Sequence, residues 1–126
     1  MTAALSEHAR VVAVEPVTCA SLHEAMAAGR PVDVPVSGVA ADSLGARRVG
    51  RIGYEVTTAA GVASLLVDDR AIVEARRQLW EEYRIVVEHG SAAAQAALTS
   101  GAYVPAGGER VVVLLCGANT DPADLA

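Results

Sequence analysis

The run VVVLLCGANTD, residues 111–121, joins five consecutive apolar residues to a short polar segment. An unbroken run of valine and leucine is typical of a parallel strand that is buried on both faces. In open α/β sheets, ligands bind beyond the carboxyl ends of the strands. We therefore expect a strand over Val111–Leu115, with the thiol of Cys116 and the amide of Asn119 placed to meet a ligand.

Two earlier apolar runs predict further strands, and helical patterns lie between them. The first, residues 11–15, stops at Pro16, and the second, residues 63–67, stops at the pair Asp68-Asp69. Helices are predicted over residues 20–28, 42–56, 70–83 and 91–100. The alternation predicts an α/β fold, a three-layer open parallel sheet with flanking helices. Three strands make a thin sheet, so we expect it to be incomplete relative to a larger domain.

The composition predicts one α/β domain over residues 1–126 and excludes several classes of protein. The chain has 52% hydrophobic residues and a net charge of -5, and no aromatic-interleaved basic patch that would suit nucleic acid. No apolar stretch approaches the ~18 residues that span a bilayer, so no membrane partner is expected. Cys19 and Cys116 lack metal-ligand spacing, and we expect a reduced, cytoplasmic protein. All ten basic residues are arginine, and the chain has no lysine.

Spacing alone leaves the role of each polar strand end open. Glu15 is either a ligand contact or a solvated carboxylate, and Asp68 and Asp69 are interpreted as helix caps. Cys116 is either a ligand partner or an inert thiol. The segment 88–91 precedes a helix, where free N–H groups favour an anion, but an ordinary helix start explains it equally well.

Several runs, taken together, resemble the C-terminal part of the pyridoxal-phosphate-dependent serine/threonine dehydratase family, which also contains serine racemase. They follow the family's order and spacing and cover nearly the whole chain. The matching runs are residues 11–16, 22–31, 38–45, 79–88 and 111–119. The resemblance implies a fold type II domain that binds pyridoxal phosphate and converts serine or threonine to a 2-oxo acid and ammonia.

The resemblance also implies a role for four residues at a cofactor edge. Cys116 matches the family's Ser or Cys that hydrogen-bonds the pyridine nitrogen, and Gly117 and Asn119 match the turn that follows. Ala118 replaces the second glycine of that turn. Glu88 matches an acidic residue near the cofactor ring.

A divalent cation is held in some members of the family at positions that match Glu15, Cys19 and Ser21. The third of these positions is usually acidic, and it is a serine here. We therefore expect no metal at these weak candidates.

The family's Schiff-base lysine and its glycine-rich phosphate loop lie upstream of the region matched here. Because the chain has no lysine, we expect it to be inactive alone and not to bind pyridoxal phosphate covalently. One hypothesis is a fragment or truncated homologue of a threonine/serine ammonia-lyase, completed by a lysine-bearing N-terminal half or by a homo-oligomer, with an amino acid as substrate. The alternative is a non-catalytic α/β module that binds a protein or a small molecule. The origin of such a chain is left open between a misplaced start, a split enzyme and a decayed homologue.

Overall fold

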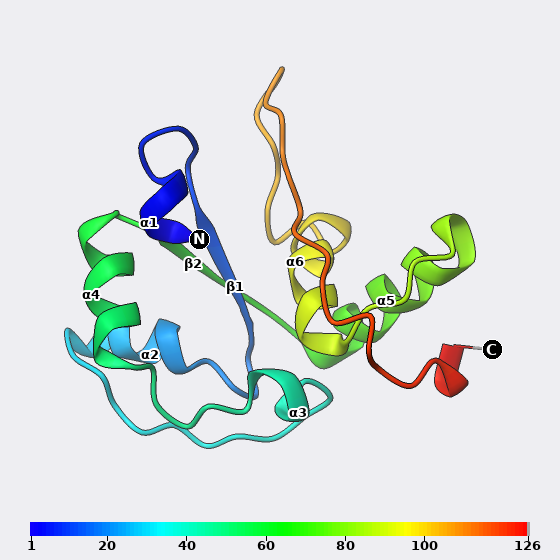
Figure 1. The fold of residues 1–126 in the computed structure, drawn as a ribbon, viewed down its shortest axis with the longest axis horizontal. Coiled ribbons are helices and arrows are strands. Elements are labelled where there is room, and N and C mark those ends of the chain that lie inside the picture. Colours follow the sequence, from blue (N-terminus) through cyan, green and yellow to red (C-terminus); the bar gives the residue numbers. More distant parts are fainter. Residues whose placement is uncertain (126) are drawn as a thin grey trace.

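The structure, a computed structural model, describes residues 1–125 of the chain (Figure 1). Its helices and strands follow the predicted alternation. In chain order they are α1 (Thr2–Leu5), β1 (Val12–Pro16), α2 (Ser21–Ala28), α3 (Ala41–Leu44), α4 (Arg51–Ala59), β2 (Ala63–Val67), α5 (Asp69–Tyr83), α6 (His89–Thr99) and a terminal 3₁₀ turn, η1 (Ala123–Leu125).

The sheet consists of β1 and β2, which pair in parallel with Val12 opposite Ala63 and Pro16 opposite Val67. Parallel neighbours need a crossover, and α2, α3 and α4 supply it. Figure 1 shows α2 and α4 on one side of the two strands and α5 with α6 on the other. The described residues thus form an α/β arrangement of three layers, as predicted.

Two helix ends follow directly from local sequence signals. The Asp68 side chain accepts a hydrogen bond of 2.8 Å from the backbone N–H of Ala71 and so caps α5. Gly29 ends α2 in the left-handed conformation, with φ 68°. The predicted helices over 20–28, 70–83 and 91–100 are confirmed, with starts shifted by one or two residues.

The core lies where α5 and α6 pack together and α6 covers both strands. Val67, Ile72, Leu79 and Val87 are buried there. The buried side of α6 is made of alanines, namely Ala92, Ala93, Ala96 and Ala97. Methyl groups let two helices approach closely, so a core with few large side chains still excludes water.

The prediction of one helix over residues 42–56 is wrong. The chain instead forms the short α3, an irregular segment over 45–50, and then α4. Gly45 packs against the carbonyl of Ala41 without room for a Cβ, and Gly50 is extended, with ψ 147°. The two glycines interrupt the pattern because glycine favours breaks over helix interiors. Ile52, an apolar residue of α4, is exposed.

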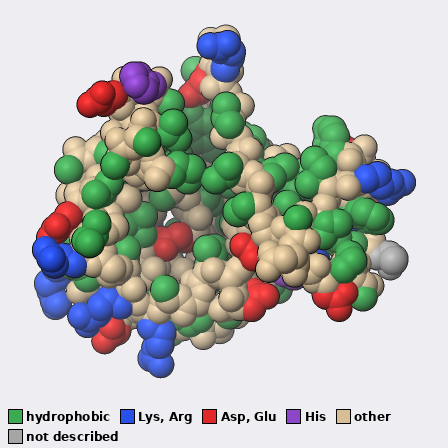
Figure 2. Space-filling view, in the orientation of Figure 1, with side chains coloured by type: hydrophobic (Ala, Val, Ile, Leu, Met, Phe, Trp, Pro, Cys, Tyr) green, Lys and Arg blue, Asp and Glu red, His purple; other side chains and the backbone are tan. Residues whose placement is uncertain are grey.

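The strand predicted over Val111–Leu115 is not formed within the described residues. The segment is extended, but no neighbouring strand pairs with it. Leu115 packs against the core beside α6, whereas Val112 is 91% exposed and Leu114 57% exposed. Apolar side chains are visible along this projecting arm in Figure 2. A continuous apolar run predicts a strand with both faces buried. The strand forms only if neighbouring strands pair with it, and the run itself does not contain them.

Candidate functional site

The turn after residue 115 brings together three of the four predicted cofactor residues. Gly117 has φ 68°, and the Glu88 side chain lies directly against it, where a Cβ would stand. The backbone N–H of Cys116 donates a hydrogen bond of 2.9 Å to the Ser91 hydroxyl. The start of α6 therefore holds the turn in place beside Glu88.

The side chains of this turn are open to solvent. Cys116 and Asn119 are exposed, and Glu88 is half-buried at the N-cap position of α6. Asn119 follows on the same turn but forms no side-chain hydrogen bond to a described residue. The arrangement presents a thiol and an amide outward, with a carboxylate beside them.

One of the backbone N–H groups at the start of α6 already has a hydrogen-bond partner within the chain. The N–H of Gly90 donates to the Ser43 hydroxyl at 3.1 Å, and Gly90 packs tightly against α3. An anion would need such N–H groups to be free. The contact supports the ordinary helix start among the two alternatives for residues 88–91.

Glu15 serves α2 rather than a ligand. Its carboxylate oxygens accept hydrogen bonds from the backbone N–H groups of Leu22, at 2.9 Å, and His23, at 2.7 Å. Cys19 is 1% exposed, and burial raises the pKa of its thiol. Ser21 is also buried. Among residues 1–125, no group of three or more His, Cys, Asp or Glu side chains is placed to hold a metal ion.

Asp69 has a role that the sequence did not reveal. Its carboxylate accepts hydrogen bonds from the Thr18 hydroxyl, at 3.0 Å, and from the N–H of Val39, at 3.2 Å. Gly38 packs against the same carboxylate, with φ 83°. Asp68 alone caps α5, and Asp69 joins the end of β1 to the loop before α3.

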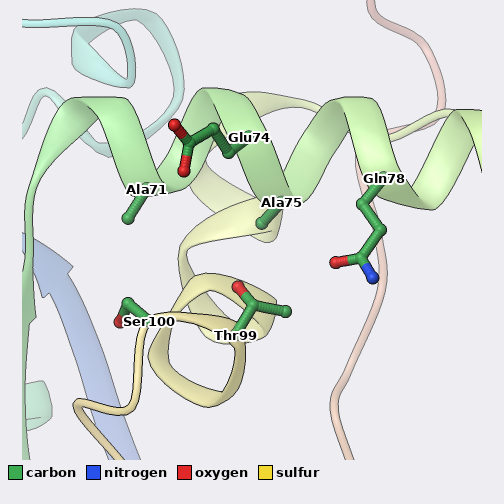
Figure 3. Close-up of a pocket in the computed structure, with 6 residues that line it drawn as sticks. All are labelled: Ala71, Glu74, Ala75, Gln78, Thr99 and Ser100. Carbon is green, nitrogen blue, oxygen red and sulfur yellow. The ribbon is translucent and has the colours of Figure 1, made fainter.

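The surface hollows of the described residues include two that lie away from the predicted cofactor residues. The first, of about 250 Å³, lies between α5 and the end of α6 (Figure 3). Glu74 and Gln78 of α5 border it together with Thr99 and Ser100. The second, of about 180 Å³, lies over residues 17–35.

Comparison with known proteins identifies the family. The model of the pyridoxal-phosphate dependent enzyme family matches residues 2–117. The chain belongs to this family. The predicted resemblance to serine/threonine dehydratases is confirmed at the level of the family and of its relatives.

Curated relatives of this family member are serine/threonine dehydratases and similar enzymes. Phenylserine dehydratase of Ralstonia pickettii is 34% identical over 97% of the chain, and the serine dehydratase-like protein of Mus musculus is 36% identical over 90%. In each comparison the match covers 37% of the relative. The chain thus spans little more than a third of the length of these relatives.

Solved structures of fold type II enzymes share the fold of this family member. A threonine deaminase from T.th. superimposes with a TM-score of 0.67 at 27% identity, covering 81% of the chain and 38% of that enzyme. Maize serine racemase gives 0.66 at 29% identity, covering 75% of the chain and 28% of the racemase. The three-layer α/β prediction is therefore confirmed, with the chain corresponding to part of the larger domain.

The residues at the turn fit one side of the family's cofactor. An exposed thiol can hydrogen-bond a ring nitrogen, and the glycine that follows leaves no side chain between the turn and Glu88. The chain offers no lysine for covalent attachment. The donor groups of this turn are of the kind that one edge of the cofactor ring would need, and residues 1–125 include no lysine as a covalent anchor.

Proposed function

We propose that this chain forms the carboxyl-terminal part of a pyridoxal-phosphate-dependent ammonia-lyase that acts on serine, threonine or a related 3-hydroxy amino acid. The observation that carries the proposal is the contact of Glu88 with Gly117, directly beside the exposed Cys116. The names of the relatives support the reaction class, because they are dehydratases and deaminases.

Four residues of this chain would hold the cofactor ring. Pyridoxal phosphate, when bound, supplies an electron sink for elimination from an amino acid. Cys116 would donate a hydrogen bond from its thiol to the pyridine nitrogen as a neutral partner, and Gly117 would let the Glu88 side chain lie against the turn beside the ring. Glu88 and Asn119 would border the ring on either side of that turn.

The covalent attachment would come from a lysine outside residues 1–126. We propose that a lysine-bearing segment, which corresponds to the N-terminal half of the relatives, completes the site. The exposed arm of residues 111–115 supports this, because its apolar side chains and unpaired backbone lead directly to Cys116. A bilayer-spanning helix is not found among the described residues. We propose a cytoplasmic location for the complete enzyme, which suits its two free cysteines.

Complementation tests the proposal. The chain is co-expressed with the lysine-bearing N-terminal half of a bacterial relative, and formation of 2-oxo acid from threonine is measured. We expect activity from the pair and none from either part alone. Cys116→Ala should lower the activity of the pair, whereas Thr58→Ala, a change on α4 away from the site, should not. A pair that associates but stays inactive with serine, threonine and phenylserine would contradict the proposed activity.

A second function is favoured by the missing lysine. A non-catalytic module with this fold would bind a partner or a small molecule without turnover. It would be supported if the chain failed to associate with any lysine-bearing half and yet bound pyridoxal phosphate or an amino acid in calorimetry.

A further inference from the structure

Arg76 is a buried charge in the middle of α5, with 3% of its surface exposed. Its guanidinium reaches three acceptors on two other segments. Nε donates to the Val87 carbonyl at 2.8 Å, Nη1 to the Asp124 carboxylate at 2.5 Å, and Nη2 to the Asp121 carbonyl at 3.0 Å.

These two segments flank the candidate cofactor edge. Val87 directly precedes Glu88, and Asp121 lies two residues beyond Asn119. At its other end, the same turn is held by the hydrogen bond from Cys116 to Ser91. The turn over 116–121 is therefore fastened at both ends, to α6 by Ser91 and to α5 by Arg76.

The chemistry of the side chain suits this task. Removing a cation from water is unfavourable, and here hydrogen bonds to two carbonyls and a carboxylate offset that cost. A guanidinium holds several acceptors in one plane, which an ammonium group cannot do at the same angles.

We propose that Arg76 is a positioning residue, which fixes Glu88 and the Cys116–Asn119 turn in the arrangement that receives the cofactor ring. The functional part of the inference rests on the proposed function. The structural part, that one guanidinium orders both segments, is independent of it. Neither Glu88 nor Cys116 contacts Arg76 through its side chain in the hydrogen bonds of the described residues, so the effect would pass through the backbone.

Amide hydrogen exchange of the whole chain, followed by mass spectrometry, tests the structural part. In Arg76→Lys, we expect exchange in residues 85–88 and 116–125 to rise roughly ten- to a hundredfold, as for the loss of a charge-assisted hydrogen bond. Exchange in β1 and β2 should stay within about twofold. Arg77→Lys, at an exposed position on the same helix, is the matched control and should change neither segment.

A milder variant keeps the test decisive if Arg76→Lys fails to fold. Asp124→Asn removes only the carboxylate from the tail, and its side chain is 56% exposed. We expect it to speed exchange in residues 119–125 and to leave residues 85–88 unchanged. Uniformly faster exchange across the chain, in either variant, would show a general loss of stability and overturn the proposal.

Cofactor affinity gives the readout that separates positioning from stability. Binding of added pyridoxal phosphate to the co-expressed pair of halves, with the wild-type or the variant chain, is followed by its absorbance at a temperature where every variant is folded. We expect Arg76→Lys to weaken binding at least fivefold and Arg77→Lys to leave it unchanged. Unchanged affinity in a folded Arg76→Lys would overturn the positioning role. If the pair that contains the wild-type chain does not bind pyridoxal phosphate, the proposed cofactor edge fails instead, and hydrogen exchange still decides whether Arg76 orders the two segments.

Discussion

Two features require glycine at position 117: its backbone conformation and the packing of a neighbouring side chain against it. Its φ of 68° is costly for other residues, and the Glu88 side chain occupies the space a Cβ would need. Gly117→Ala should lower the free energy of unfolding by about 1–2 kcal/mol, measured by urea denaturation. Gly107→Ala is the control, because Gly107 has open space around its Cβ position and no positive φ. Equal effects at the two glycines would contradict the packing seen at the turn.

His89 gives the fold a dependence on pH. Burial, and then the nearby charge of Arg76, lower the pKa of His89 below its ordinary 6.5. The folded state therefore binds the proton less readily than the unfolded state does. The contribution of neutral His89 to the free energy of unfolding should be fully present above pH 6.5. It should decline as the pH falls from there through the lowered pKa of His89.

Urea denaturation at pH 7.5, 6.5 and 5.5 measures this decline. His89→Gln should show a smaller loss over the same range, because it removes the titrating group. The same slope in wild type and variant would assign the decline to other groups.

Helices and strands could be predicted where the residues that determine them lie next to one another in the sequence. Asp68 and Gly29 mark helix ends that the structure confirms, because caps act through the nearest turn. The apolar run over 111–115 already indicated Cys116 and Asn119 as ligand contacts, whereas the place of Glu88 beside them came only from the resemblance. The long-range hydrogen bonds of Asp69 and Arg76 could not be predicted from local sequence. The partners of Asp69 lie at least 30 residues away, and those of Arg76 at least 11. The prediction of a strand over 111–115 was wrong because a strand needs a neighbouring strand to pair with, and the apolar run does not determine that neighbour.

The start of α5 is an element that can be tested alone. Asp68→Ala removes the hydrogen bond to the N–H of Ala71 and should cost about 1 kcal/mol of unfolding free energy. Asp33→Ala is the control, since its ion pair with Arg48 is exposed and such pairs contribute little. A thermal melt of the two variants should show the larger fall in midpoint for Asp68→Ala.

For the whole molecule, the exposed arm of residues 111–115 predicts association. Val112 and Leu114 lie two residues apart, so their side chains share one side of an extended, unpaired segment. We expect concentration-dependent self-association in sedimentation velocity, reduced by the double change Val112→Glu and Leu114→Glu. Ile52→Glu, at an exposed apolar position on α4, should not reduce it. A stable monomer at all concentrations would contradict the prediction.

The register of the sheet also has a consequence for the order of folding. Every pair between β1 and β2 joins residues 51 positions apart, as in Val12 with Ala63. By contrast, α5 and α6 are separated by only residues 84–88. Closing the longer loop carries the larger entropic penalty, so contacts between neighbouring helices should form first. In pulse-labelled refolding, we expect the amides of α5 and α6 to gain protection before those of β1, which makes strand pairing the slow step of this chain.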